Sequence, residues 1–146
     1  MKKFFLLFFT VLSFSIYEAK SQSSVTEITW TAADYIQYKG LLVLYPNNQG
    51  IFRVTYYLPT INSWVWVDQK AILSNTFDAY GNCTSYIHCS NPRSIPNVPY
   101  AADAFVIFPN GNMYTQDSSG KWSTLIRGIM LQPQYWQAKL REYGFN

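Results

Sequence analysis

The residues of this chain that could do covalent or metal chemistry gather between positions 83 and 89. Cys83, His88 and Cys89 are its two cysteines and its one histidine. They supply at most three zinc ligands, whereas a closed structural zinc site takes four. A nucleophile–histidine pair would depend on His88 alone, and no G-x-S-x-G, HExxH or phosphate-binding glycine motif is present. We therefore expect no metal, no cofactor and a solvent-facing histidine.

The two cysteines instead predict a disulfide. In an oxidising compartment two cysteines usually pair. Six residues apart, Cys83 and Cys89 would be separated by about 9 Å in a helix and about 20 Å in a strand. A disulfide needs Cα atoms within about 7 Å, so the pairing requires a tight reversal near Tyr86. Residues 73–100 contain three prolines and are expected to form a long irregular loop that carries this reversal.

The first 21 residues have the layout of a secretory signal peptide. Lys2 and Lys3 precede the apolar run FFLLFFTVLSFSI, and small residues stand at Ala19 and Ser21. The run is too short for an ordinary membrane span, which takes about 20 residues. We expect cleavage near Ser21, a secreted or periplasmic location and no stable membrane insertion of the mature chain. The Asn82-Cys83-Thr84 sequon matters only in a eukaryotic source.

Residues 22–146 predict one secreted, β-rich domain. They carry eight basic and seven acidic residues, a net charge of +1, and the cations are scattered. Nucleic-acid binding needs a concentrated basic surface, so we exclude that class of partner. The same residues include five Trp, eleven Tyr and five Phe. Most of these rings would fill the core, but tyrosine is also at ease on a wet surface.

Residues 41–71 are the stretch around which the rest of the fold is organised. They predict three strands joined by two turns, PNNQG and PTINS. Because successive side chains on a strand point to opposite faces, matching the apolar faces fixes the register. Four residues of the second strand, Phe52, Val54, Tyr56 and Leu58, form the predicted core face.

The opposite face is the candidate binding site. The register places Tyr57 opposite Trp64, Thr55 opposite Trp66 and Arg53 opposite Asp68. This face would be an aromatic contact surface edged by charges, unless the C-terminal helix covers it. The predicted ligand-binding residues are Arg53, Thr55, Tyr57, Trp64, Trp66 and Asp68.

The remaining elements complete the expected architecture. We expect a short strand over residues 25–30, a short helix over residues 31–40, a hairpin over residues 103–116 and a helix over residues 133–143. Val43-Leu-Tyr-Pro-Asn47 recurs as Val106-Ile-Phe-Pro-Asn110, and either duplication or chance similarity of two common turns explains this echo. The fold class is therefore α+β and mainly antiparallel β. It consists of two three-strand meanders in one sheet, or a small barrel, with the C-terminal helix on one face.

The expected function is non-catalytic recognition of an extracytoplasmic glycan or protein through the aromatic face. Stacked rings contact sugar faces or anchor protein interfaces. An alternative is a small enzyme inhibitor that presents the Cys83–Cys89 loop. A carboxylate-dependent hydrolase comes last, because paired acids need no sequence spacing but the mature chain has only seven acids.

Overall fold

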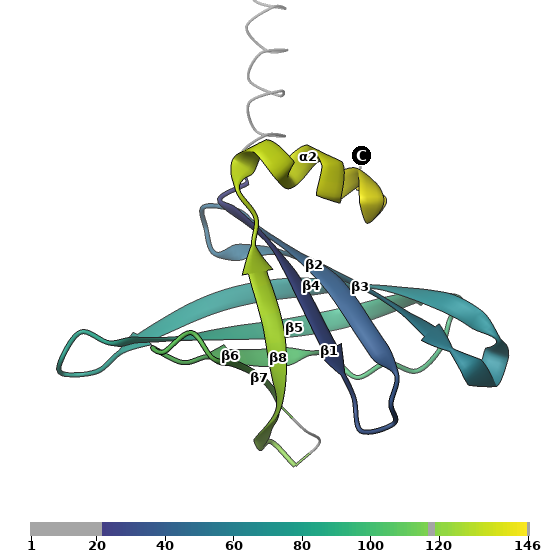
Figure 1. Ribbon diagram of the computed structural model, residues 1–146, viewed down its shortest axis with the longest axis horizontal. Coiled ribbons are helices and arrows are strands. Elements are labelled where there is room, and N and C mark those ends of the chain that lie inside the picture. The colour runs from purple at the N-terminus through teal and green to yellow at the C-terminus, as the bar shows by residue number, and fades with distance from the viewer. Residues whose placement is uncertain (1–21, 117–118, 146) are drawn as a thin grey trace, which may run out of the picture.

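The chain forms a closed barrel of eight consecutive antiparallel strands. The computed structural model describes residues 22–116 and 119–145, and the predicted signal peptide lies outside them. Each strand pairs with the next along the chain, and the last pairs with the first. Figure 1 shows this meander with one helix outside it. The elements are β1 (Ser24–Thr31), β2 (Gln37–Leu44), β3 (Gln49–Leu58), η1 (Pro59–Ile61), β4 (Ser63–Phe77), β5 (Cys83–Ile95), β6 (Ala104–Ile107), β7 (Met113–Gln116), β8 (Trp122–Met130) and α2 (Pro133–Glu142).

The fold class predicted from the sequence is confirmed, in its barrel form. Closure depends on β1 and β8, where Ile28 pairs with Gly128 and Thr26 with Met130. The register predicted for β3 and β4 is also confirmed, since Val54 is opposite Val67 and Tyr56 opposite Val65. One-sided burial therefore predicted both which side chains point inward and how the two strands align.

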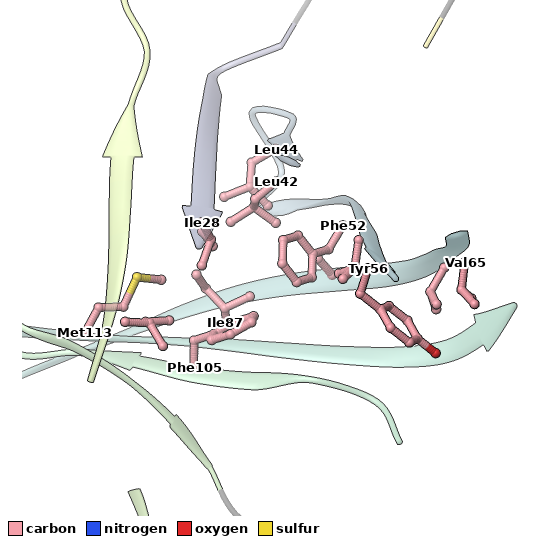
Figure 2. Close-up of a cluster of buried hydrophobic side chains, with 13 residues drawn as sticks. Ile28, Leu42, Leu44, Phe52, Tyr56, Val65, Ile87, Phe105 and Met113 are labelled. Atoms are coloured by element: carbon pink, nitrogen blue, oxygen red, sulfur yellow. The ribbon is translucent and has the colours of Figure 1, made fainter. Parts of the chain in front are cut away.

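The inward side chains fill the barrel with one continuous apolar core. Phe52 and Phe105 are fully buried and meet edge to face, with ring centroids 5.2 Å apart. Figure 2 shows both rings within the cluster, with Ile28 and Ile87 beside them. The buried members of the core are Ile28, Leu42, Leu44, Phe52, Val54, Tyr56, Val65, Val67, Ala71, Ile87, Phe105, Met113 and Ile126.

The helix predicted over residues 31–40 does not form. The chain reverses over five residues, with the Ala32 N–H donating to the Ile36 carbonyl at 3.0 Å. The Asp34 carboxylate accepts from the Ile36 N–H, also at 3.0 Å, so it caps a turn instead of a helix. Gly40 lies within β2, where a Cβ atom would come within 2.5 Å of the Phe52 ring. Packing inside the barrel therefore overrides the local helix signal.

The predicted disulfide is wrong. Cys83 and Cys89 are unpaired, and both lie on β5. At about 3.3 Å per residue, a strand separates them by about 20 Å, far beyond the reach of an S–S bond. The predicted irregular loop over residues 73–100 is also wrong. Most of it is an antiparallel ribbon in which β4 continues to Phe77 and pairs with β5.

The sequence missed this ribbon because its outer part is exposed on both sides. Residues 74–82 are all exposed, so no alternation of apolar and polar side chains marks the strands. Backbone hydrogen bonds to the neighbouring strand hold them. In Figure 1 the ribbon reaches one extremity of the molecule at the turn after β4.

The echo between residues 43–47 and 106–110 corresponds to two turns of the same geometry. The Tyr45 N–H donates to the Gln49 carbonyl, and the Phe108 N–H donates to the Asn112 carbonyl, both at 2.9 Å. The turn from Asp78 to Asn82 repeats the bond at 3.0 Å with an unrelated sequence. The shared geometry therefore reflects a turn class and does not require a duplication.

The predicted C-terminal helix is confirmed as α2, which lies outside the barrel (Figure 1). Its apolar stripe, with Trp136, Leu140 and Tyr143, packs on the outward side chains Val25, Leu41 and Val43. Within residues 22–116 and 119–145, no helix is long and apolar enough to cross a bilayer.

Two further contacts fix α2. Gly144 has φ +74°, and the Phe145 N–H donates to the Leu140 carbonyl at 2.8 Å, which closes the helix in a Schellman turn. Glu27 of β1 accepts from the Tyr143 hydroxyl at 2.8 Å and from Lys139 Nζ at 3.2 Å.

Candidate functional site

The six residues predicted as a binding surface all lie on the outer face of β3 and β4. Three of them expose aromatic rings: Trp64 is 58% exposed, Tyr57 38% and Trp66 37%. Tyr57 and Trp64 are cross-strand partners and meet edge to face at 5.8 Å. The Tyr57 hydroxyl hydrogen-bonds to Asn62. Helix α2 therefore leaves these rings open to solvent.

Thr55 lies at the predicted position but supports the surface from beneath. It is 2% exposed, and its hydroxyl donates to the Val65 carbonyl at 3.0 Å. A ligand cannot reach this hydroxyl. The accessible surface consists of the three rings and the neighbouring charges, and we call Tyr57, Trp64 and Trp66 the aromatic strip.

Arg53 and Asp68 form the predicted cross-strand pair. Arg53 Nε donates to Asp68 Oδ1 at 2.7 Å, and the guanidinium Nη2 donates to Oδ2 at 2.9 Å. These hydrogen bonds raise the pKa of Arg53 above its ordinary value, while partial burial opposes the rise. Such a two-point pair holds both side chains in one orientation. The charges at the edge of the aromatic strip are therefore preorganised.

Arg53 also joins the strip to the end of α2. Its Nη1 donates to the Tyr143 carbonyl at 2.9 Å, and its guanidinium lies 4.2 Å from the centre of the Phe145 ring. The Tyr143 ring meets Trp66 edge to face at 6.2 Å. Helix α2 therefore borders the strip at Trp66, whereas Trp64 lies beyond it.

A hollow of about 350 Å³ opens where the strip meets α2. Two arginines that the sequence did not single out, Arg93 of β5 and Arg141 of α2, line it together with Arg53. Arg93 is the cross-strand partner of Asp68, so it would have been found had β5 been recognised as a strand. Neither Arg93 nor Arg141 has an ion pair with any described residue. The hollow is lined by Arg53, Trp66, Asp68, Arg93, Ile95, Arg141, Glu142, Tyr143 and Gly144.

A broader depression lies on the other side of Trp64. It has a volume of about 880 Å³ and extends over β1, β2 and β8. Lys39 and Arg127 border it, and Trp64 forms part of its wall. The aromatic strip therefore lies between two concave regions, and a ligand longer than one ring could extend into either.

The residues first considered for metal or nucleophilic chemistry are not brought together. His88 is exposed on the outside of β5, where its ring stacks against Tyr86 at 6.3 Å. Cys89 points toward the core and packs against it. Among residues 22–116 and 119–145, no three His, Cys, Asp or Glu side chains are grouped so that they could hold a metal ion.

Comparison of the chain with known protein families, curated proteins and solved structures gives no match.

Proposed function

We propose that this protein is an extracytoplasmic, non-catalytic recognition protein that binds an acidic glycan on the outer face of β3 and β4. The observation that carries the proposal is the solvent-exposed aromatic strip beside a fixed arginine–aspartate pair. Large exposed apolar groups clustered on one face commonly mark an interaction site. The leader-like layout of residues 1–21 supports a location outside the cytoplasm.

The strip suits a sugar because a pyranose has one apolar face and a polar edge. Trp64, the most exposed of the three rings, offers a flat surface for the apolar face. Arg53 and Asp68 are held at fixed positions beside Trp66, where they can hydrogen-bond to hydroxyl groups. Because the pair is already ordered, binding costs little side-chain entropy there.

The hollow beside Trp66 favours an acidic sugar over a neutral one. Three arginines face the two carboxylates of Asp68 and Glu142 there, which leaves one positive charge in excess. Arg93 and Arg141 are exposed and make no ion pair with a described residue. A guanidinium binds a carboxylate or sulfate group through two parallel hydrogen bonds. A uronic acid or sulfated sugar fits this charge pattern.

A glycan array with acidic and neutral members tests the proposal. Trp64→Ala should abolish binding and cost only about 1 kcal/mol of stability, since the ring is more than half exposed and loses one aromatic pair. A fully packed tryptophan would cost about 3–5 kcal/mol. Arg93→Gln should weaken the binding of acidic glycans more than the binding of neutral ones.

Tyr80→Ala is the matched control, because Tyr80 is 90% exposed in the turn after β4, away from the strip. It should leave binding and melting temperature unchanged. A Trp64→Ala protein that unfolds several kcal/mol more easily, yet retains its glycan, would contradict the proposal.

A protein partner is the second candidate, and Ile95 favours it. This side chain is 77% exposed and lines the hollow beside Trp66, so it extends the apolar surface beyond what a sugar needs. A blank glycan array, together with a protein cross-linked to wild type but not to Trp64→Ala, would favour this candidate.

A further inference from the structure

The mouth of the barrel opposite α2 contains a third concave region, which includes no residue of the aromatic strip. It has a volume of about 660 Å³, within the range of about 300–1,000 Å³ typical of small-molecule sites. The turns after β1, β3 and β5 surround it. We call it the cup. Its main lining residues are Trp30, Ile36, Tyr38, Tyr56, Leu58, Val98, Tyr100 and Asp103.

Four aromatic rings form a continuous wall of the cup. Trp30 stacks on Tyr38 with ring centroids 5.2 Å apart and planes 8° apart. Tyr38 contacts Tyr56 at 4.8 Å, and Tyr56 contacts Tyr100 at 5.8 Å. Figure 2 shows the Tyr56 hydroxyl directed away from the apolar cluster. The wall therefore places aromatic rings and phenol groups around one opening.

Asp103 places a carboxylate at the base of this wall. One of its oxygens, Oδ2, accepts from Gln69 Nε2 at 2.7 Å and from the Tyr100 hydroxyl at 2.8 Å. Its backbone N–H donates to Gln69 Oε1 at 2.8 Å. The other oxygen, Oδ1, has no hydrogen bond with any residue among 22–116 and 119–145. Of the two carboxylate oxygens, only Oδ2 therefore takes part in holding the loop.

No described residue supplies a counter-charge to this carboxylate. The residues that line the cup include two acids, Asp34 and Asp103, and no Lys, Arg or His. The anchoring role needs only one acceptor oxygen, which an asparagine would provide without the cost of burying a charge. The charge itself therefore has no partner within the described protein.

We propose that the cup binds a small organic cation, an amine or quaternary ammonium group on an apolar or aromatic body. The cation lies against Asp103 Oδ1 and the π-faces of the tyrosines, and the body packs on Trp30 and Leu58. An aromatic enclosure attracts cations through the ring quadrupole, and a half-buried carboxylate adds a charge-assisted hydrogen bond. This site shares no residue with the aromatic strip or with the hollow beside Trp66.

Three probes with one skeleton test the proposal: phenethylamine, 2-phenylethanol and 3-phenylpropionate. Titration calorimetry on the purified protein at pH 7.5 should show the amine binding at least about tenfold more tightly than the alcohol, and the acid most weakly. Asp103→Asn keeps an acceptor for Gln69 and Tyr100 but removes the charge. It should weaken the affinity for the amine at least about tenfold and change the affinity for the alcohol by less than about threefold.

Asp78→Asn is the matched control, since Asp78 is an exposed carboxylate in the turn after β4 and lines none of the concave regions. It removes the same charge and should bind the amine as wild type does. A melt of each variant shows that it folds. Three results would overturn the proposal: the amine binds no more tightly than the alcohol, Asp103→Asn binds the amine as wild type does, or folded wild type binds none of the probes. Glycan binding by Asp103→Asn should be intact, so failure here is distinguishable from failure at the aromatic strip.

Discussion

Replacing Asp103 with asparagine should make the protein more stable at neutral pH and flatten its dependence on pH. Burial raises the pKa of the Asp103 carboxyl from 3.8 to about 6, although the hydrogen bonds from Gln69 and Tyr100 oppose the rise. In the unfolded chain the carboxyl has its ordinary pKa of about 3.9. The folded state therefore binds this proton more tightly than the unfolded state does.

Proton linkage gives both the sign and the size of this change in stability. Protonated Asp103 favours the folded state, and this contribution is fully present below about pH 4. It is lost as the pH rises through about 6, because the folded protein must then hold a buried charge. The difference between the two pKa values corresponds to about 3 kcal/mol. Asparagine resembles the protonated form, so at pH 7 the variant should be more stable by up to about 3 kcal/mol, or roughly 10 °C in melting temperature.

Urea unfolding of wild type and Asp103→Asn at pH 4, 5, 6 and 7 measures this directly. The free energies of unfolding should be similar at pH 4 and diverge toward pH 7. Tyr38, Tyr56, Tyr100 and Cys89 near Asp103 stay uncharged over this range, because burial raises their pKa values. Asp34→Asn controls for the change in net charge.

The reasoning would be refuted if Asp103→Asn were less stable than wild type by the same amount at every pH. Such a result would mean that the carboxylate is well solvated or compensated in the folded protein. It would also remove the argument that Asp103 carries an uncompensated charge into the cup.

Three further outcomes are expected. Non-reduced protein, alkylated in denaturant, should gain two adducts by mass, since Cys83 and Cys89 are unpaired; in the native state Cys89 should react more slowly, because burial raises its thiol pKa. A one-adduct or unmodified mass would be inconsistent with the β5 strand. Gly40→Ala should lower the free energy of unfolding by about 1–3 kcal/mol, because its Cβ atom would meet the Phe52 ring at 2.5 Å; an unchanged denaturation midpoint would contradict this contact. Glu27→Gln should lower the free energy of unfolding by about 1–3 kcal/mol and speed hydrogen exchange in α2, because the carboxylate accepts hydrogen bonds from Lys139 and Tyr143. Unchanged exchange in α2 would show that apolar packing alone holds this helix.

Asp103 also shows the limit of sequence reasoning about function. In the sequence it is only the first residue of a predicted hairpin, because nothing local distinguishes it from a turn aspartate. Trp30, Tyr38, Tyr56 and Tyr100 come from four separate segments, and their meeting at one mouth is a property of the closed barrel. The outer aromatic strip was predictable, since its residues lie on two strands joined by a short turn.

The sequence by itself determined the features that neighbouring residues control. Alternating burial along β3 and β4 predicted their core faces and register, Asn110-Gly111 predicted the β6–β7 turn, and Pro133 with Gly144 bounded α2. Only the tertiary structure decided closure, since β1 and β8 are about 100 residues apart and their pairing depends on every strand between them. It also decided the state of Cys83 and Cys89, because residues 83–95 form β5 by pairing with β4 and β6, and these pairings between segments are not written in the local sequence.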